Sequence, residues 1–168
     1  GVSDLLKYSA DRTKELLVAQ LNYRLGEVQD ALVTASLERI FIENRIYKDK
    51  PFEEAACEAD ALDHVRKRIE AMEDLVFVRP ITEADLKRLL EIKMARILRF
   101  NIEKHEERIA QLMRDARTIE KHLAHSTQYT IDYYTRLLKE FGAGWTRKTT
   151  IARFGTIEAT KVIEATEK

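Results

Sequence analysis

Residues 101–141 carry the sequence "NIEKHEERIAQLMRDARTIEKHLAHSTQYTIDYYTRLLKEF", in which mostly apolar side chains recur at every seventh position. These a positions of a heptad are Ile102, Ile109, Ala116, Leu123, Thr130 and Leu137. The companion d positions, three residues further on, include Leu112, Ile119 and Tyr133. The pattern predicts one unbroken helix of about 40 residues, near 60 Å long, that packs its stripe against a partner helix.

The partner is predicted at the N-terminal end of the chain, where helical periodicity runs from Asp4 to about Tyr47. An apolar stripe recurs there at intervals of three and four residues, through Leu17, Leu21, Leu25, Val28 and Leu32. Ser36 is a potential cap for a second helical segment, and Pro51 stops or redirects the chain. Because a lone helix of this length needs a partner to bury its stripe, we expect the two long helices to lie antiparallel as a coiled coil.

The residues between the two long helices predict a compact helical head. A shorter helix is expected over residues 51–72, with its buried side formed by Ala56, Ala59, Leu62, Val65 and Ile69. Residues 75–80, "LVFVRP", favour an extended or turn-like connection. "TEAD" at Thr82–Asp85 is typical of a capping motif, and the helix that it opens is expected to run to about Arg99.

The sequence therefore predicts an all-α fold: a long antiparallel two-helix coiled coil with a small helical globular head at its tip. Residues 1–35 form the descending helix, residues 36–100 the head and residues 101–141 the ascending helix, which ends at Phe141 before a glycine. Residues 142–168 are expected to form a basic tail or the start of a further segment.

Composition narrows the classes of function. The 168 residues include 29 basic and 29 acidic side chains, and a net charge of zero argues against a strong nucleic-acid footprint. No apolar run approaches the roughly 20 residues of a membrane span, so no membrane partner is expected. The single cysteine, Cys57, suits a reducing compartment and predicts a cytoplasmic protein. The chain begins with Gly1 rather than Met, which indicates either a tag remnant or a segment of a longer protein.

Polar rings gather in the second long helix, where His122 and His125 lie one turn apart. Two histidines supply at most half of a tetrahedral zinc site, and the facing stripe is mainly Leu and Val. We interpret them as structural, with His125 exposed and with the rings of Tyr133 and Tyr134 packed so that their hydroxyls face water. No phosphate loop, basic cradle around a tyrosine or Ser-His-Asp arrangement is present, so we predict no catalytic, cofactor-binding or metal-binding residues.

Residues 86–100, "LKRLLEIKMARILRF", carry more apolar surface than one helix face needs. On a single helix, apolar side chains would cover more than half of the circumference, which predicts a contact with another molecule. The residues expected in this dimer interface are Leu90, Ile92, Met94, Ile97 and Leu98. A central helix wrapped by its own chain is an equally good interpretation.

Three stretches resemble one family. "SLERIFIENRIYKD" (residues 36–49), "ITEADLKRLLEIKMARILRFNIEK" (81–104) and "KEFGAGWTRKTTIARFGTIEATKV" (139–162) are together similar to the A subunit of bacterial type IIA topoisomerases, topoisomerase IV and gyrase. "LLEIKMARI" resembles the family's Leu-Asp-Leu-Arg-Leu-x-x-Leu helix, with Glu91, Lys93, Met94 and Ile97 in the matching places. Lys93 and Ala95 depart from the more usual Arg and Gln.

The resemblance implies that the head is the exit gate, or C-gate, at which two A subunits meet. It further implies that the catalytic tyrosine lies before residue 1, and that Mg²⁺ and ATP are used by other domains and by the B subunit, so that this segment holds no cofactor. Its implied partners are a second copy of the head, the B subunit through other parts of the chain, and double-stranded DNA in transit during ATP-dependent strand passage. The resemblance does not separate topoisomerase IV from gyrase.

Two other interpretations of the residues stay open. One is a stand-alone coiled-coil adaptor with a helical head and no connection to DNA. The other is a metal-binding helical bundle built on His122 and His125.

Overall fold

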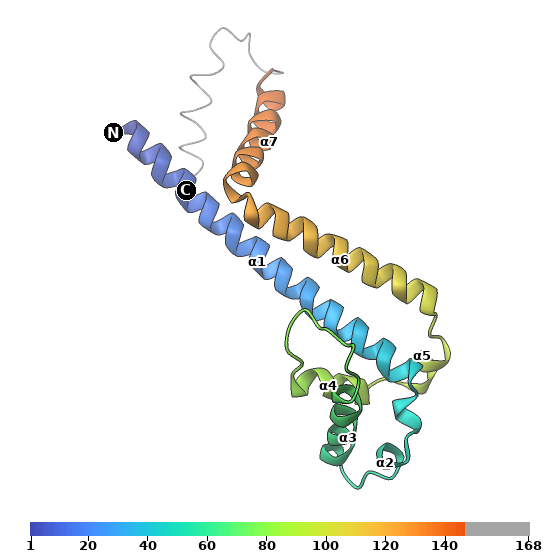
Figure 1. Cartoon of the computed structure of the whole chain (residues 1–168). Helices are drawn as coiled ribbons and strands as arrows, with labels where there is room; N and C mark the ends of the chain where they lie inside the picture. Colours follow the sequence, from blue (N-terminus) through green and yellow to red (C-terminus); the bar gives the residue numbers. More distant parts are fainter. Residues whose placement is uncertain (147–168) are drawn as a thin grey trace. The chain divides into compact units, whose positions relative to one another are not determined.

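The computed structural model describes residues 1–146, and side chains for residues 1–142, as an all-helical chain (Figure 1). The helices are α1 (Val2–Glu43), a 3₁₀ turn η1 (Ile46–Lys48), α2 (Lys50–Glu53), α3 (Glu58–Glu70), α4 (Glu83–Leu90), α5 (Met94–Leu98), α6 (Ile102–Ala124) and α7 (Ser126–Thr146). The predicted all-α class is confirmed, since no strand occurs between residues 1 and 146. Most of the predicted basic tail, residues 147–168, lies outside the described residues.

The chain divides into two compact units. Unit 1 contains Gly1–Arg24 and the chain from Thr118 onward, and unit 2 contains Leu25–Arg117. Helices α1 and α6 each contribute residues to both units. Because each unit has its own buried residues, the two are described separately.

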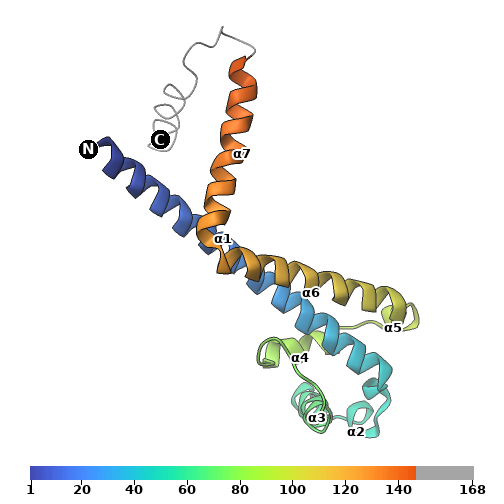
Figure 2. The ribbon, with the colours of Figure 1, turned by 45° about the horizontal axis from the view of Figure 1, so that its top comes forward.

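The core of unit 2 lies where α3 and α4 pack on the C-terminal part of α1 (Figure 2). Its buried residues are Val33, Leu37, Ile40, Phe41, Ile46, Leu62, Val65, Ile69, Leu86 and Leu89. They recur at helical intervals of three and four, so each helix turns one apolar face inward. Burial of each large aliphatic side chain contributes about 1.5–3 kcal/mol. The ring of Phe41 also packs against Tyr47 and Phe52, with centroids 5.8 and 5.7 Å away.

Two side-chain contacts join α6 to α1 within unit 2. Arg39 Nη2 donates a hydrogen bond to Glu106 Oε1 at 2.8 Å. His105 Nε2 donates to the carbonyl oxygen of Ala35 at 2.7 Å, and because a carbonyl only accepts, this ring nitrogen carries the proton. The start of α6 is therefore held beside α1. A continuous coiled coil along both long helices stays a prediction.

Unit 1 joins the N-terminal part of α1 to the end of α6 and to α7. Its buried residues are Leu17, Leu21, Ile119 and Thr130. The Tyr134 hydroxyl donates to Thr13 Oγ1 at 2.8 Å, and Lys14 Nζ donates to Thr127 Oγ1 at 3.0 Å. The prediction that the Tyr134 hydroxyl faces water is therefore wrong, because the facing surface of α1 offers it a hydroxyl partner.

The prediction of a single helix over residues 101–141 is also wrong in two respects. It is interrupted at His125, between α6 and α7, and α7 continues past Phe141 to Thr146. Residues 126–130, "STQYT", have low helix propensity, and Thr130 Oγ1 donates to the carbonyl oxygen of Ser126 at 2.8 Å, a contact that bends helices. The heptad pattern does not indicate this break, because Ile119 and Thr130, which lie on either side of it, are both buried.

Two other predicted helices differ at their ends. α1 runs through Ser36 and ends at Glu43, after which Arg45 adopts a left-handed conformation with φ 50°. The predicted helix at 51–72 divides into α2 and α3, with Pro51 in the first turn of α2. The buried side of α3 is Ala61, Leu62, Val65 and Ile69, whereas the predicted Ala56 and Ala59 are exposed.

Candidate functional site

The candidate interface helix is not one helix. α4 ends at Leu90 and α5 begins at Met94, with Lys93 extended at φ −78° and ψ 147° between them. The break lies between these helices at residues 91–93, and Ile92 within it packs against the core of unit 2. Residues 86–100 therefore do not present one helix surface with excess apolar coverage, and the predicted interface residues have different environments.

The five predicted interface residues differ in their burial and fall into three groups. Leu90 and Ile92 pack against the core of unit 2 and are accounted for by the chain's own fold. Ile97 is half-buried. Met94 is 56% exposed and Leu98 is 80% exposed. Because Met94 and Leu98 are four residues apart on α5, they share one face of that helix, and they form the exposed apolar pair.

A groove lies on unit 2 next to this pair. Its volume is about 510 Å³, and its lining comes from α1, α5, the connections before and after α5, and α6. The lining residues are Glu38, Lys93, Ala95, Arg96, Arg99, Phe100, Asn101, Lys104, His105 and Arg108. We call this surface the basic groove, because five of its residues are cations and only Glu38 is acidic. The sequence does not reveal this groove, because the same cations are interspersed with carboxylates along the chain.

Glu38 and Arg96 form an ion pair at one wall of the basic groove. Arg96 Nε and Nη2 donate to the two carboxylate oxygens of Glu38 at 2.5 and 3.1 Å. The hydrogen bond raises the pKa of Arg96, as the Coulombic attraction does. Glu38 is buried on α1, while the Arg96 side chain is 65% exposed. The ion pair therefore attaches α5 to α1, and Arg96 still lines the groove.

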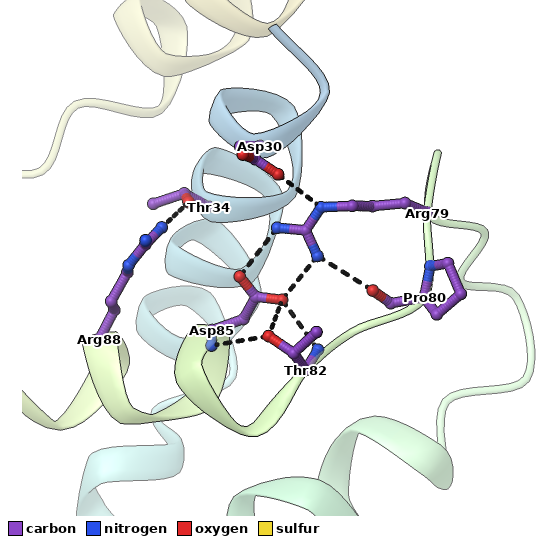
Figure 3. Close-up of polar contacts among 7 residues, drawn as sticks. All are labelled: Asp30, Thr34, Arg79, Pro80, Thr82, Asp85 and Arg88. Atoms are coloured by element: carbon purple, nitrogen blue, oxygen red, sulfur yellow. Dashed lines mark hydrogen bonds and ion pairs between the residues drawn. The ribbon is translucent and has the colours of Figure 1, made fainter. Parts of the chain in front are cut away.

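A second polar cluster fixes the start of α4 (Figure 3). Arg79 Nη1 and Nη2 donate to the two oxygens of Asp85 at 2.7 and 2.9 Å, while Arg79 Nε donates to Asp30 on α1 at 2.7 Å. The Thr82 backbone N–H also donates to Asp85, and the Asp85 N–H donates to Thr82 Oγ1, which confirms the predicted capping motif. These donors lower the pKa of Asp85 well below its usual range, with the Arg79 hydrogen bonds as the largest cause.

The two histidines of the second long helix lie in unit 1. The His122 ring packs against Tyr129 with centroids 4.7 Å apart, and His125 is exposed between α6 and α7. No group of three or more potential metal ligands occurs among the residues that the structure describes. The absence of a metal site in this chain stays a prediction. None of the helices within residues 1–146 is long and apolar enough to cross a membrane.

The structure thus defines, within residues 1–142, an all-helical arrangement with an exposed apolar pair and a basic groove. Over 153 residues the chain is 26% identical to the A subunit of DNA topoisomerase 4 from Borreliella burgdorferi. The alignment covers 90% of this chain and 24% of that relative, so the chain spans about a quarter of the relative's length. This similarity suggests a distant link to the topoisomerase IV A subunits. No protein-family model and no solved structure matches the chain.

Proposed function

We propose that the chain is the part of a type IIA topoisomerase A subunit that forms the exit gate, or C-gate. The observation that carries this proposal is the similarity to a topoisomerase IV A subunit over 90% of the chain, confined to 24% of the relative. Such an alignment fits one structural segment of a larger enzyme. The helices α3 and α4, which pack on the C-terminal part of α1, would form the body of such a gate.

In this proposal two copies meet through the head, residues 36–100, by the face of α5 that carries Met94 and Leu98. Both side chains are largely exposed and have no core role in the isolated chain. Bringing them together would remove apolar surface from water at about 25 cal/mol per Å². A contact this small holds two copies together only weakly, which suits an interface that opens in every catalytic cycle.

The rest of the reaction is assigned to other parts of the enzyme. DNA cleavage, Mg²⁺ and ATP hydrolysis would belong to the B subunit and to the remainder of the A subunit, in a cytoplasmic complex. The segment described here would act after strand passage, when the transported duplex leaves through the opened head contact. The segment would then make or break no covalent bond. Its role would be to form, open and form again a non-covalent interface.

The first test is the oligomeric state of this chain. We expect sedimentation equilibrium at about 10–100 µM to show a monomer–dimer equilibrium. Met94→Glu and Leu98→Glu should each weaken the dimer at least about tenfold in Kd, because each would bury an unpaired carboxylate in the contact.

Met113→Glu is the matched control for this test. Met113 is 46% exposed on α6 and lies outside the proposed contact, so this variant should dimerise as the parent does. Circular dichroism should show the same helical signal for all three variants. A parent chain that is strictly monomeric at 100 µM would contradict the gate and favour the stand-alone adaptor.

A further inference from the structure

The basic groove has the properties of a site for the backbone of double-stranded DNA, and we propose that it contacts the phosphates of the duplex that passes through the gate. The identity of the ligand as duplex DNA rests on the proposed function, because a passing duplex is the polyanion that such a gate would meet. The site itself rests on the charges, exposure and pairing of the groove residues.

The groove separates cations from anions that are intermingled in the sequence. Residues 91–108 contain five basic side chains, at Lys93, Arg96, Arg99, Lys104 and Arg108, and four acidic ones, at Glu91, Glu103, Glu106 and Glu107. All five basic residues line the groove and none of the four acidic ones does. The fold therefore concentrates positive charge on one surface of a nearly neutral segment, as nucleic-acid-binding proteins do on the face that meets the backbone.

Most of these cations are not used by the fold. Lys93, Arg99, Lys104 and Arg108 are exposed, and within the described part of the chain none of their side chains makes an ion pair or hydrogen bond. Only Arg96 is paired, with Glu38. Like charges gathered in one groove repel each other, so an arrangement of this kind is favourable when an anion occupies it.

The shape of the cluster favours a regular polyanion over an acidic peptide. Lys104 and Arg108 lie one turn apart on α6, and Arg99 adds a planar guanidinium, which binds phosphate through two parallel N–H donors. An acidic peptide would need apolar anchor pockets for specificity. Among the lining residues only Ala95 and Phe100 are apolar, and the ring of Phe100 already packs on His105 with centroids 4.8 Å apart.

A few phosphate contacts give weak binding that depends strongly on salt. With two to four phosphates neutralised, log Kobs should fall with log[salt] at a slope of about −2 to −4. Contacts of this strength guide a duplex without retaining it. They agree with a chain whose net charge is zero, because the attraction is local to the groove.

The test is binding of this 168-residue chain to a fluorescently labelled duplex of about 30 base pairs, followed by anisotropy at several salt concentrations. We expect Lys104→Gln with Arg108→Gln to weaken binding about tenfold or more at 50 mM salt and to reduce the salt slope by about 2. The matched control is Arg66→Gln with Lys87→Gln, which removes the same charge from α3 and α4 outside the groove. This control should bind within about twofold of the parent.

Three outcomes would overturn the proposal: equal weakening in the control pair, no measurable binding by the parent at 50 mM salt, or equal competition by polyglutamate and unlabelled duplex. Sedimentation of the same samples separates the two proposals. A dimer that does not bind DNA would overturn the groove and leave the gate, whereas a strict monomer that binds DNA through the groove would overturn the gate.

Discussion

Asp85→Ala is expected to lower the free energy of unfolding by about 2–3 kcal/mol, and the melting temperature by about 5–10 °C. Asp85 is 4% exposed and accepts hydrogen bonds from Arg79 and Thr82. Its loss removes half of the capping box of α4 and leaves Arg79 with Asp30, whose side chain is 59% exposed, as its remaining carboxylate partner. Thermal unfolding followed by circular dichroism at pH 7 measures the change.

The pH dependence gives this prediction a second readout. The folded-state pKa of Asp85 lies below its unfolded value, so its contribution to stability is complete above the ordinary carboxyl pKa of 3.8 and is lost as the pH falls below it. The difference in stability between the parent and Asp85→Ala should therefore be full at pH 7 and shrink as the pH falls from about 4 toward 2.

Glu83→Ala is the matched control, because Glu83 is an exposed carboxylate in the same first turn of α4. It should change stability by less than about 1 kcal/mol, since it gives up only a helix-dipole interaction. Equal melting temperatures for the Glu83→Ala and Asp85→Ala variants would show that the cluster around Arg79 does not hold α4 in place.

If the head is the proposed exit gate, covalent joining of two heads is expected to abolish multiple turnover of the complete enzyme while DNA cleavage and resealing persist. The variant is Leu98→Cys in a full-length chain in which Cys57, an exposed thiol, is replaced by Ser. A disulfide across the two-fold contact would close the exit, so a transported duplex has no way out. Reduction should restore turnover, because a disulfide is cleaved by thiol exchange.

The cross-link also tests the interface. A disulfide needs Cα atoms within about 7 Å, so Leu98→Cys should oxidise between the two copies and Met113→Cys, outside the contact, should not. If Leu98→Cys stays reduced, Met94→Cys on the same face of α5 is the second position. Turnover that continues undiminished with both heads joined would rule out an exit gate in the head.

The parts of the fold that depend on local signals were predictable. The stripe from Leu17 to Leu32 identified the inner face of α1, since every one of its predicted members is buried or half-buried. The hydroxyl and carboxylate of Thr82–Asp85 identified the start of α4, because a capping box is formed by neighbours in sequence.

The parts that depend on tertiary contacts were not predictable. The break after Leu90 places Ile92 against the core, and no Gly or Pro within residues 86–100 indicates it. Arg79 meets Asp30 across 49 positions of sequence, and the basic groove takes its acidic member, Glu38, from a different helix. Similarly, nothing near Tyr134 in the sequence indicates that its hydroxyl meets Thr13.

Arg96 belongs both to the ion pair that seats α5 and to the groove proposed for DNA. A phosphate that bound the Arg96 guanidinium in place of Glu38 would leave the buried Glu38 carboxylate without its charge partner. It would also weaken the attachment to α1 of α5, the helix that carries Met94 and Leu98. Occupancy of the groove and closure of the head contact would then be linked by one coupling free energy. Because such coupling is reciprocal, duplex DNA should raise the dimer Kd in sedimentation by the same factor by which dimerisation weakens DNA binding. The passing duplex would in this way act as an effector that favours its own release.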